Sequence, residues 1–219
     1  MRRMPVLCGI VAFGLLCWLF PPFRIVPLKQ AQAEAKLAVF DAPAFAANFW
    51  TNRLIPALGR AADATRVLDA LARDPRHARE QFGRSVGLSS SCYFFLRGAG
   101  TVVSAGAKGV GLALTNSAPE PDVRLLTGLL FGNAVRDATG LLDPGQFANS
   151  QHFNDLATEL NRIVETRVLP QLREQALPGR RLRFVGCVEL DEGAEVSRPL
   201  AIVPVQVSVE LQAAGPTHE

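Results

Sequence analysis

Residue types that build catalytic and metal sites are scarce in this chain. Its 219 residues include three histidines and four cysteines. His77, His152 and His218 have no Cys, Asp or Glu at ligand spacing, whereas a metal site needs roughly three or four convergent ligands. The stretch Gly106–Gly109 lacks the spacing and the following Ser or Thr of a phosphate-binding loop. We therefore expect no metal, no cofactor and no enzymatic activity.

An excess of charge of one sign is also missing. Lys and Arg number 23 and Asp and Glu 20, and Arg2 and Arg3 supply part of that small difference. The densest basic group, Arg180, Arg181 and Arg183, is typical of a solvated strand edge. Proteins bind nucleic acid through a concentrated basic face, so we expect no nucleic-acid partner.

One long apolar run is present, and it lies at the N-terminus. No charged residue occurs from Met4 to Phe23, and a bilayer-spanning helix needs roughly 20 apolar residues. Arg2 and Arg3 before the run predict that the N-terminus stays in the cytoplasm and that the rest is exported. We therefore predict an inner-membrane anchor through residues 4–23 and a globular part in the periplasm.

Two alternatives to this retained anchor exist. Ala31-Gln32-Ala33 resembles the cleavage site of a secretory signal, but Arg24 and Lys29 separate it from the apolar run, so retention is favoured. Lipidation of Cys17 is not expected, because Leu15-Leu16 stands where small residues should precede the modified cysteine.

Two cysteines, Cys92 and Cys187, fall in the exported part. An even pair in an oxidising compartment permits a disulfide between them. Two separate, partly buried thiols are the alternative, and the low density of cysteines favours it.

The exported part predicts helices first and strands afterwards. Helical spacing covers residues 42–84, with a break at Pro56 and a new start at Asp74-Pro75, an N-cap followed by proline. Apolar alternation then predicts five strands, with one long helix between the third and the fourth. In order, these elements are strands 93–104, 110–114 and 122–130, a helix from 149 or 150 to 175, and strands 182–190 and 201–211.

This order of elements matches a five-stranded barrel of the OB type. We predict an α+β fold with an N-terminal transmembrane helix, a helical hairpin and an OB-like antiparallel barrel. Gly98 and Gly100 predict a bulge or bend, and Pro204 an edge position or bulge. The expected divisions are an anchor (1–23), a connector (24–41), one periplasmic domain (42–212, helical over 42–84 and the barrel with its helix over 92–212) and a flexible tail (213–219).

Several segments give the chain a likeness to a known family. They include Arg24-Ile25-Val26-Pro27-Leu28, Phe49-Trp50, Gly98–Val103, Gly132–Ala138, Phe147–Asn149 and Ile202–Val205. On these segments the chain resembles the predicted periplasmic lipoprotein family known as domain of unknown function 2291. Where many relatives carry a lipidated cysteine before Ile-Val-Pro, this chain has Phe23-Arg24, which favours a helical anchor. The resemblance implies an exported, membrane-tethered protein, often associated with ABC-type sugar uptake transporters, and implies no activity.

The candidate site centres on Arg136 and Asp137, adjacent opposite charges in an apolar stretch. A structural role is favoured, because buried charges are normally paired within the fold. In the functional alternative, Arg136 binds an anionic or sugar ligand together with Asn149 and Asn161. For Trp50 we expect core packing first and ligand or partner contact second.

Three functions remain open on the sequence alone. The leading one is a non-enzymatic accessory or binding protein that contacts an ABC transporter subunit or a substrate-binding protein and takes a small polar ligand. The second is an envelope hydrolase that uses Asp137 with Arg136. The third is a purely structural tether.

Overall fold

Short helices come first in the part of the chain that the structure, a computed structural model, describes: residues 40–87, 90–115 and 120–210. They are α3 (Ala42–Phe49), the π-helical turn η1 (Trp50–Leu54), the 3-10 helix η2 (Ile55–Arg60), α4 (Ala64–Arg73) and α5 (Pro75–Phe82). Asp41, Asp63 and Asp74 cap α3, α4 and α5 by accepting hydrogen bonds from backbone N–H groups. The helical pattern changes at η1 and η2, next to Pro56, as the sequence predicts.

A ring of paired strands follows. Its members are β2 (Ser91–Gly106), β3 (Gly109–Ala113), β4 (Val123–Leu125), β5 (Arg181–Asp191) and β6 (Leu200–Val209). The order is β2-β3-β4-β6-β5, and a further ladder joins β5 back to β2, so each of these strands pairs with two others. The predicted sequence of three strands, a long helix and two strands is therefore present.

Two details of the sheet differ from the prediction. The strands are not all antiparallel, because β4 runs parallel to β6. The third strand is also shorter than expected: β4 ends at Leu125, and the next residues leave the sheet. A short extra strand, β1 (Ala62–Asp63), pairs in parallel with Leu96 and Arg97 of β2.

The glycines of β2 serve close packing and do not mark a bulge. Residues 91–101 form an unbroken ladder with β5, and the register shift lies further on, between Val102 and Ser104. A Cβ atom on Gly98 would lie 2.9 Å from the Phe184 ring. Pro204 does lie next to a register shift, in the β5–β6 ladder, so the predicted bulge is confirmed there.

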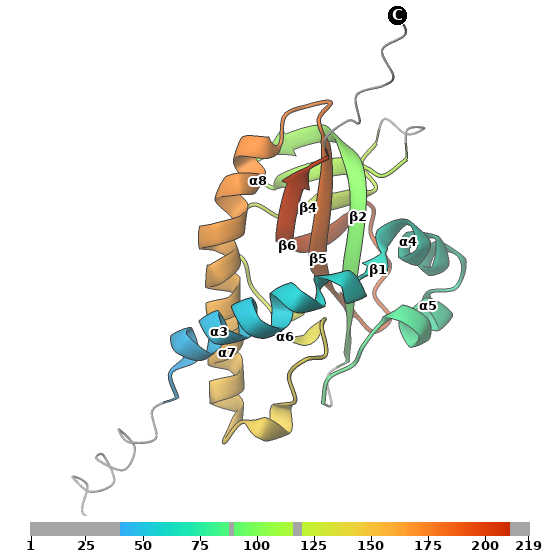
Figure 1. Ribbon diagram of the computed structural model, residues 1–219. Coiled ribbons are helices and arrows are strands. Elements are labelled where there is room, and N and C mark those ends of the chain that lie inside the picture. The colour runs from blue at the N-terminus through green and yellow to red at the C-terminus, as the bar shows by residue number, and fades with distance from the viewer. Residues whose placement is uncertain (1–39, 88–89, 116–119, 211–219) are drawn as a thin grey trace, which may run out of the picture. The chain divides into compact units, whose positions relative to one another are not determined.

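One long helical segment crosses between the third and last strands. It consists of α7 (Ser150–Ile163), the π-helical turn η4 (Val164–Val168) and α8 (Leu169–Gln175), preceded by α6 (Ala134–Asp137) and the 3-10 turn η3 (Pro144–Gln146). Asn149 caps α7, and Phe153, Leu156 and Leu160 lie on its buried face, as predicted. Figure 1 shows α7 and α8 along one side of the strands, with α4 and α5 on the other side.

The predicted anchor, connector and tail lie largely outside the described residues. Residues 1–39 and 211–219 are not among them, and these ranges contain the predicted span 4–23 and the tail 213–219. Within the described residues, no helix has the length and apolar character needed to cross a membrane.

Candidate functional site

Arg136 and Asp137 form a buried ion pair at the end of α6. Nε and Nη2 of Arg136 donate to the two carboxylate oxygens of Asp137 at 2.7 and 2.8 Å. Nη1 donates to the carbonyl of Phe153 at 3.0 Å and to Oδ1 of Asn154 at 3.2 Å, while the guanidinium carbon lies 3.7 Å from the centre of the Phe153 ring. Both residues are nearly inaccessible, with 5% of Arg136 and 3% of Asp137 exposed. This pair joins α6 to α7.

The other predicted site residues are also engaged inside the fold. Asn161 is buried on α7 and donates from Nδ2 to the carbonyl of Gly132 at 3.0 Å. Asn149 accepts a hydrogen bond from the backbone N–H of His152 as the cap of α7. Trp50 is buried in η1. The structure thus brings Arg136, Asp137 and Asn161 against α7, but each makes contacts that hold the domain together; ligand binding by them stays a prediction.

The suggested disulfide between Cys92 and Cys187 is absent, and both residues are buried free thiols. In the β2–β5 ladder Cys92 lies opposite Leu190, and Cys187 lies opposite Phe95. Positions 92 and 95 point to opposite faces of the strand, so the two sulfur atoms cannot meet without backbone movement. Burial raises the pKa of both thiols, which keeps them protonated and unreactive at neutral pH.

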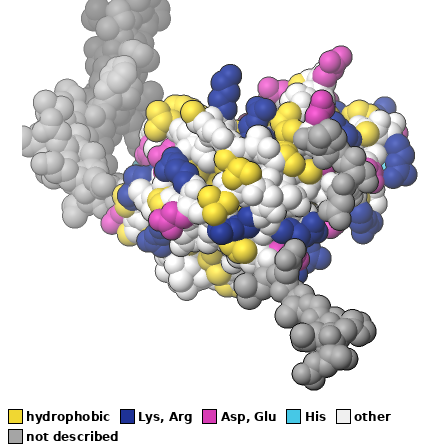
Figure 2. All heavy atoms as spheres, turned by 90° about the horizontal axis from the view of Figure 1, so that it is seen from above, with side chains coloured by type: hydrophobic (Ala, Val, Ile, Leu, Met, Phe, Trp, Pro, Cys, Tyr) yellow, Lys and Arg dark blue, Asp and Glu magenta, His cyan; other side chains and the backbone are white. Residues whose placement is uncertain are grey.

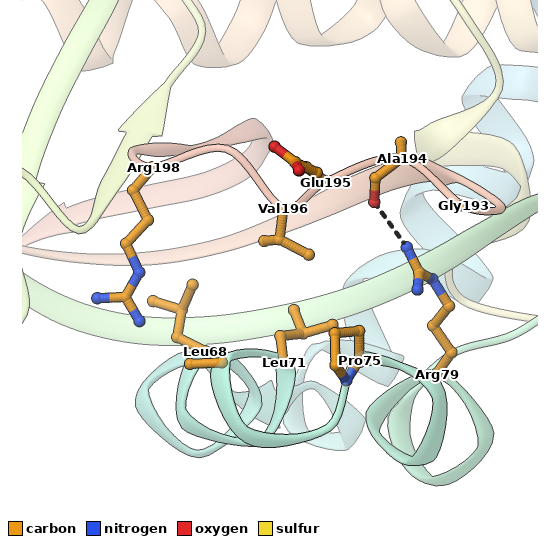
Figure 3. Close-up of a pocket in the computed structure, with 10 residues that line it drawn as sticks. Leu68, Leu71, Pro75, Arg79, Gly193, Ala194, Glu195, Val196 and Arg198 are labelled. Carbon is orange, nitrogen blue, oxygen red and sulfur yellow. Dashed lines mark hydrogen bonds between the residues drawn. The ribbon is translucent and has the colours of Figure 1, made fainter.

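A different region of the domain is hollowed: the cleft between the α4–α5 pair and the segment that connects β5 to β6. Its volume is about 570 Å³. Leu68, Leu71 and Pro75 line it from the helices, and Val196 points toward them from the β5–β6 connection (Figure 3). This floor is therefore aliphatic. We call this feature the α4–α5 cleft.

One arginine lies at each end of the α4–α5 cleft. Arg79 from α5 and Arg198 from the β5–β6 connection both line it, and Figure 3 shows them at opposite ends of the aliphatic floor. Arg198 is exposed and makes no hydrogen bond or ion pair with the described residues. Glu195 is the one acidic residue of the lining, and its carboxylate points away from Leu68 and Leu71 in Figure 3.

Arg79 is only partly satisfied by the fold. Its Nη2 donates to the carbonyls of Ala194 and Asp191 at 3.2 and 3.4 Å. Its Nε is buried and has no acceptor among the described residues. Arg79 also lines a neighbouring hollow of about 630 Å³ with Cys92 and Glu192. A cation with a spare buried donor between two hollows is suited to an anionic group of a ligand.

Charge elsewhere on the surface is mixed. Figure 2 shows basic and acidic side chains interspersed over one face of the molecule. Arg76 pairs with Glu80, and Arg181 and Arg183 both pair with Glu210. The described residues hold no group of three or more His, Cys, Asp and Glu side chains that could bind a metal ion.

Sequence reasoning missed the α4–α5 cleft. Its lining comes from segments more than 100 positions apart, as the hydrogen bond between Arg79 and Ala194 illustrates. Neither segment carries a recognisable motif. The available signal was the apolar spacing of Leu68 and Leu71 next to Arg79, which a single sequence cannot distinguish from ordinary core packing.

Comparisons with known proteins agree with this fold. A crystal structure of an OB-fold protein from Thermotoga maritima is similar, with a TM-score of 0.72 and 28% identity, and the match covers 78% of this chain and 99% of that one. A search of the curated proteins found no match. The model of the DUF2291 family, described as predicted periplasmic lipoproteins, matches residues 11–208. The family description indicates a periplasmic, membrane-anchored protein, and a match over nearly the whole length means that this chain belongs to the DUF2291 family.

Proposed function

We propose that this protein is a non-enzymatic binding protein of the periplasm, tethered to the inner membrane and accessory to an ABC-type sugar uptake system. In this proposal the ring of five strands is a closed OB-type barrel that serves as the scaffold. The α4–α5 cleft binds a small ligand with a carboxylate, such as a sugar acid. The family description supports the compartment and the tether, and the resemblance discussed above motivates the link to sugar uptake.

The observation that carries the ligand assignment is the partly unsatisfied Arg79. A buried guanidinium donor without an acceptor costs free energy, and a carboxylate that reached Nε of Arg79 would remove this cost. Arg198 offers a second cation at the other end of the cleft. The aliphatic floor between them would contact the less polar face of the ligand. A small carboxylate satisfies all three features.

The buried pair on α6 supports the absence of catalysis in this proposal. A general acid or base must reach the substrate, but both carboxylate oxygens of Asp137 accept hydrogen bonds from Arg136 and the residue is buried. A hydrolase that used Asp137 would have to break this pair and open the contact between α6 and α7. The mixed surface charge likewise favours a ligand other than nucleic acid.

Ligand binding is tested with the full-length protein in detergent. A panel of sugar acids, and the matching neutral sugars as comparison, is screened by thermal shift and then by calorimetry. We expect a sugar acid to bind and its neutral counterpart to bind much more weakly. Arg79→Gln should weaken binding by about tenfold or more, because it removes a charge-assisted contact. The control, Arg167→Gln, changes an exposed arginine of η4 outside the cleft.

Two results would refute the ligand assignment. One is a panel in which no carboxylate binds, and the other is unchanged affinity in both Arg79→Gln and Arg198→Gln. The accessory role is tested separately by co-purification of the tagged full-length protein from detergent-solubilised membranes. Recovery of a transporter subunit or a substrate-binding protein is expected, and recovery of no envelope protein would count against this role.

A further inference from the structure

The segment between β4 and α6 holds two large apolar side chains in solvent. Leu129 is 78% exposed and Phe131 is 81% exposed, whereas Leu130 between them is 7% exposed. Among the described residues these two are the most exposed large hydrophobic side chains. We call residues 128–132 the apolar tip. Exposure of this kind on two neighbouring positions normally marks a contact surface.

The apolar tip is fixed in place by hydrogen bonds on both sides. The backbone N–H of Leu130 donates to Oε1 of Glu165 at 2.7 Å, and the carbonyl of Gly132 accepts from Asn161 at 3.0 Å. At the base of the segment, Arg173 donates to the carbonyl of Thr127 at 2.6 Å. The fold therefore holds Leu129 and Phe131 outward at no further cost in conformational entropy on binding.

The apolar tip is also free of charge and of available polar side chains. No charged residue occurs between Arg124 and Arg136. The hydroxyl of Thr127 is directed at the carbonyls of Gly106 and Ala107. A typical protein interface surrounds its apolar centre with polar groups that hydrogen-bond to the partner. The polar groups of this segment are turned inward, which fits hydrocarbon better than the surface of a protein.

We propose that the apolar tip inserts into the lipid bilayer to which the protein is tethered. Membership of a lipoprotein family puts the domain close to a bilayer. Burial of a Leu or Phe side chain favours the bilayer by roughly 10- to 100-fold each. That is too weak for binding alone, but a tether supplies the second interaction that stable attachment requires. Insertion would fix the orientation of the domain on the membrane and does not depend on any ligand in the α4–α5 cleft.

The test places a tryptophan at the apolar tip. Full-length protein with Trp18→Phe is reconstituted into vesicles of phosphatidylethanolamine and phosphatidylglycerol, with lipids brominated on the acyl chains as quenchers. Phe131→Trp is compared with His77→Trp, at an exposed position of α5 on the other side of the strands. We expect brominated lipid to quench the emission of the Phe131→Trp protein and to leave that of the His77→Trp protein unchanged.

Quenching of the two proteins to the same extent would overturn the proposal. So would a tryptophan at position 131 that brominated lipid does not quench but that native membranes shield from iodide, because a protein partner would then cover the tip. Leu129→Ser with Phe131→Ser provides a second measurement. Since both side chains are exposed, the melting temperature should stay the same, while a nitroxide-labelled lipid should broaden backbone signals near Gly128 less than in the unchanged protein.

Discussion

Two arginines of this domain, Arg136 and Arg79, differ in how far the fold satisfies them. Arg136 has acceptors for Nε, Nη1 and Nη2 and an aromatic ring against its face, and its ion-pair partner Asp137 is buried with it. Arg79 has two carbonyl acceptors for one nitrogen atom, and its buried Nε has none among the described residues. Both lie at junctions between elements, one between α6 and α7 and the other between α5 and the β5–β6 connection.

This difference separates a structural charge from a charge that is available to a ligand. A fully paired buried arginine contributes to the stability and the specificity of the fold. A partly paired arginine at a cleft keeps binding capacity in reserve. The sequence drew attention to Arg136 because it lies in an apolar stretch. The structure moves the candidate site to Arg79.

The largest effect should follow removal of the carboxylate of the buried pair. Asp137→Ala would leave the charge of Arg136 buried without a counter-ion, a change that costs about 3–5 kcal/mol of stability. Thermal unfolding of the full chain in detergent, followed by circular dichroism, measures this loss.

The control for that change is Arg76→Ala, which breaks the exposed pair with Glu80 and should leave the melting temperature nearly unchanged. Replacement of both buried partners, Arg136→Met with Asp137→Leu, should recover part of the stability. A melting temperature of Asp137→Ala equal to that of the unchanged protein would contradict the structural role of the pair.

A smaller loss is expected at Asn161, on the same side of the domain. Asn161→Ala removes the donor to the carbonyl of Gly132, and a buried polar group without a partner costs about 1–3 kcal/mol. The same unfolding measurement applies, and Thr158→Ala, at an exposed position of α7, is the control. If Asn161 instead served a ligand in the free protein, its replacement would affect binding and leave the melting temperature constant.

Much of the fold could be predicted from the sequence, because its signals are local. Alternation of apolar residues gave the strands, and Asn149 and Asp74 gave the starts of helices as caps. The parallel β4–β6 pair and the short length of β4 could not be predicted in this way. They depend on which strand ends meet across the ring, and this is decided by packing between distant segments.

The candidate site was less predictable than the fold for the same reason. The sequence correctly placed Arg136 and Asp137 in a buried pair, since adjacent opposite charges within an apolar stretch have few other solutions. It could not place Arg79 beside Arg198, because their approach depends on the path of the β5–β6 connection over α4 and α5. The exposure of Leu129 and Phe131 was equally hidden, since apolar residues before a helix usually enter the core.

Arg79→Met tests the comparison directly. The hydrogen bonds of Arg79 to Ala194 and Asp191 are long, so its replacement should cost about 1 kcal/mol of stability or less, well below the loss for Asp137→Ala. Differential scanning fluorimetry of the two proteins side by side makes the measurement. If Arg79→Met destabilised the domain as strongly as Asp137→Ala, Arg79 would be a structural residue and the two regions would not differ.

The smallest effect is expected for arginines that are paired in solvent. Arg183 and, to a lesser degree, Arg181 donate hydrogen bonds to Glu210 and lower the pKa of its carboxyl below the ordinary value of 4.5. A lowered pKa in the folded state adds stability at pH values above the unfolded pKa, and this contribution is lost as the pH falls through the folded pKa. Glu210→Gln should therefore reduce stability slightly at neutral pH and flatten the decline below about pH 4.5. Melting temperatures of both proteins between pH 7 and pH 3 test this, and parallel curves would mean that solvent screens the pair completely, so that surface arginines differ from Arg136 and Arg79 in having no energetic role at all.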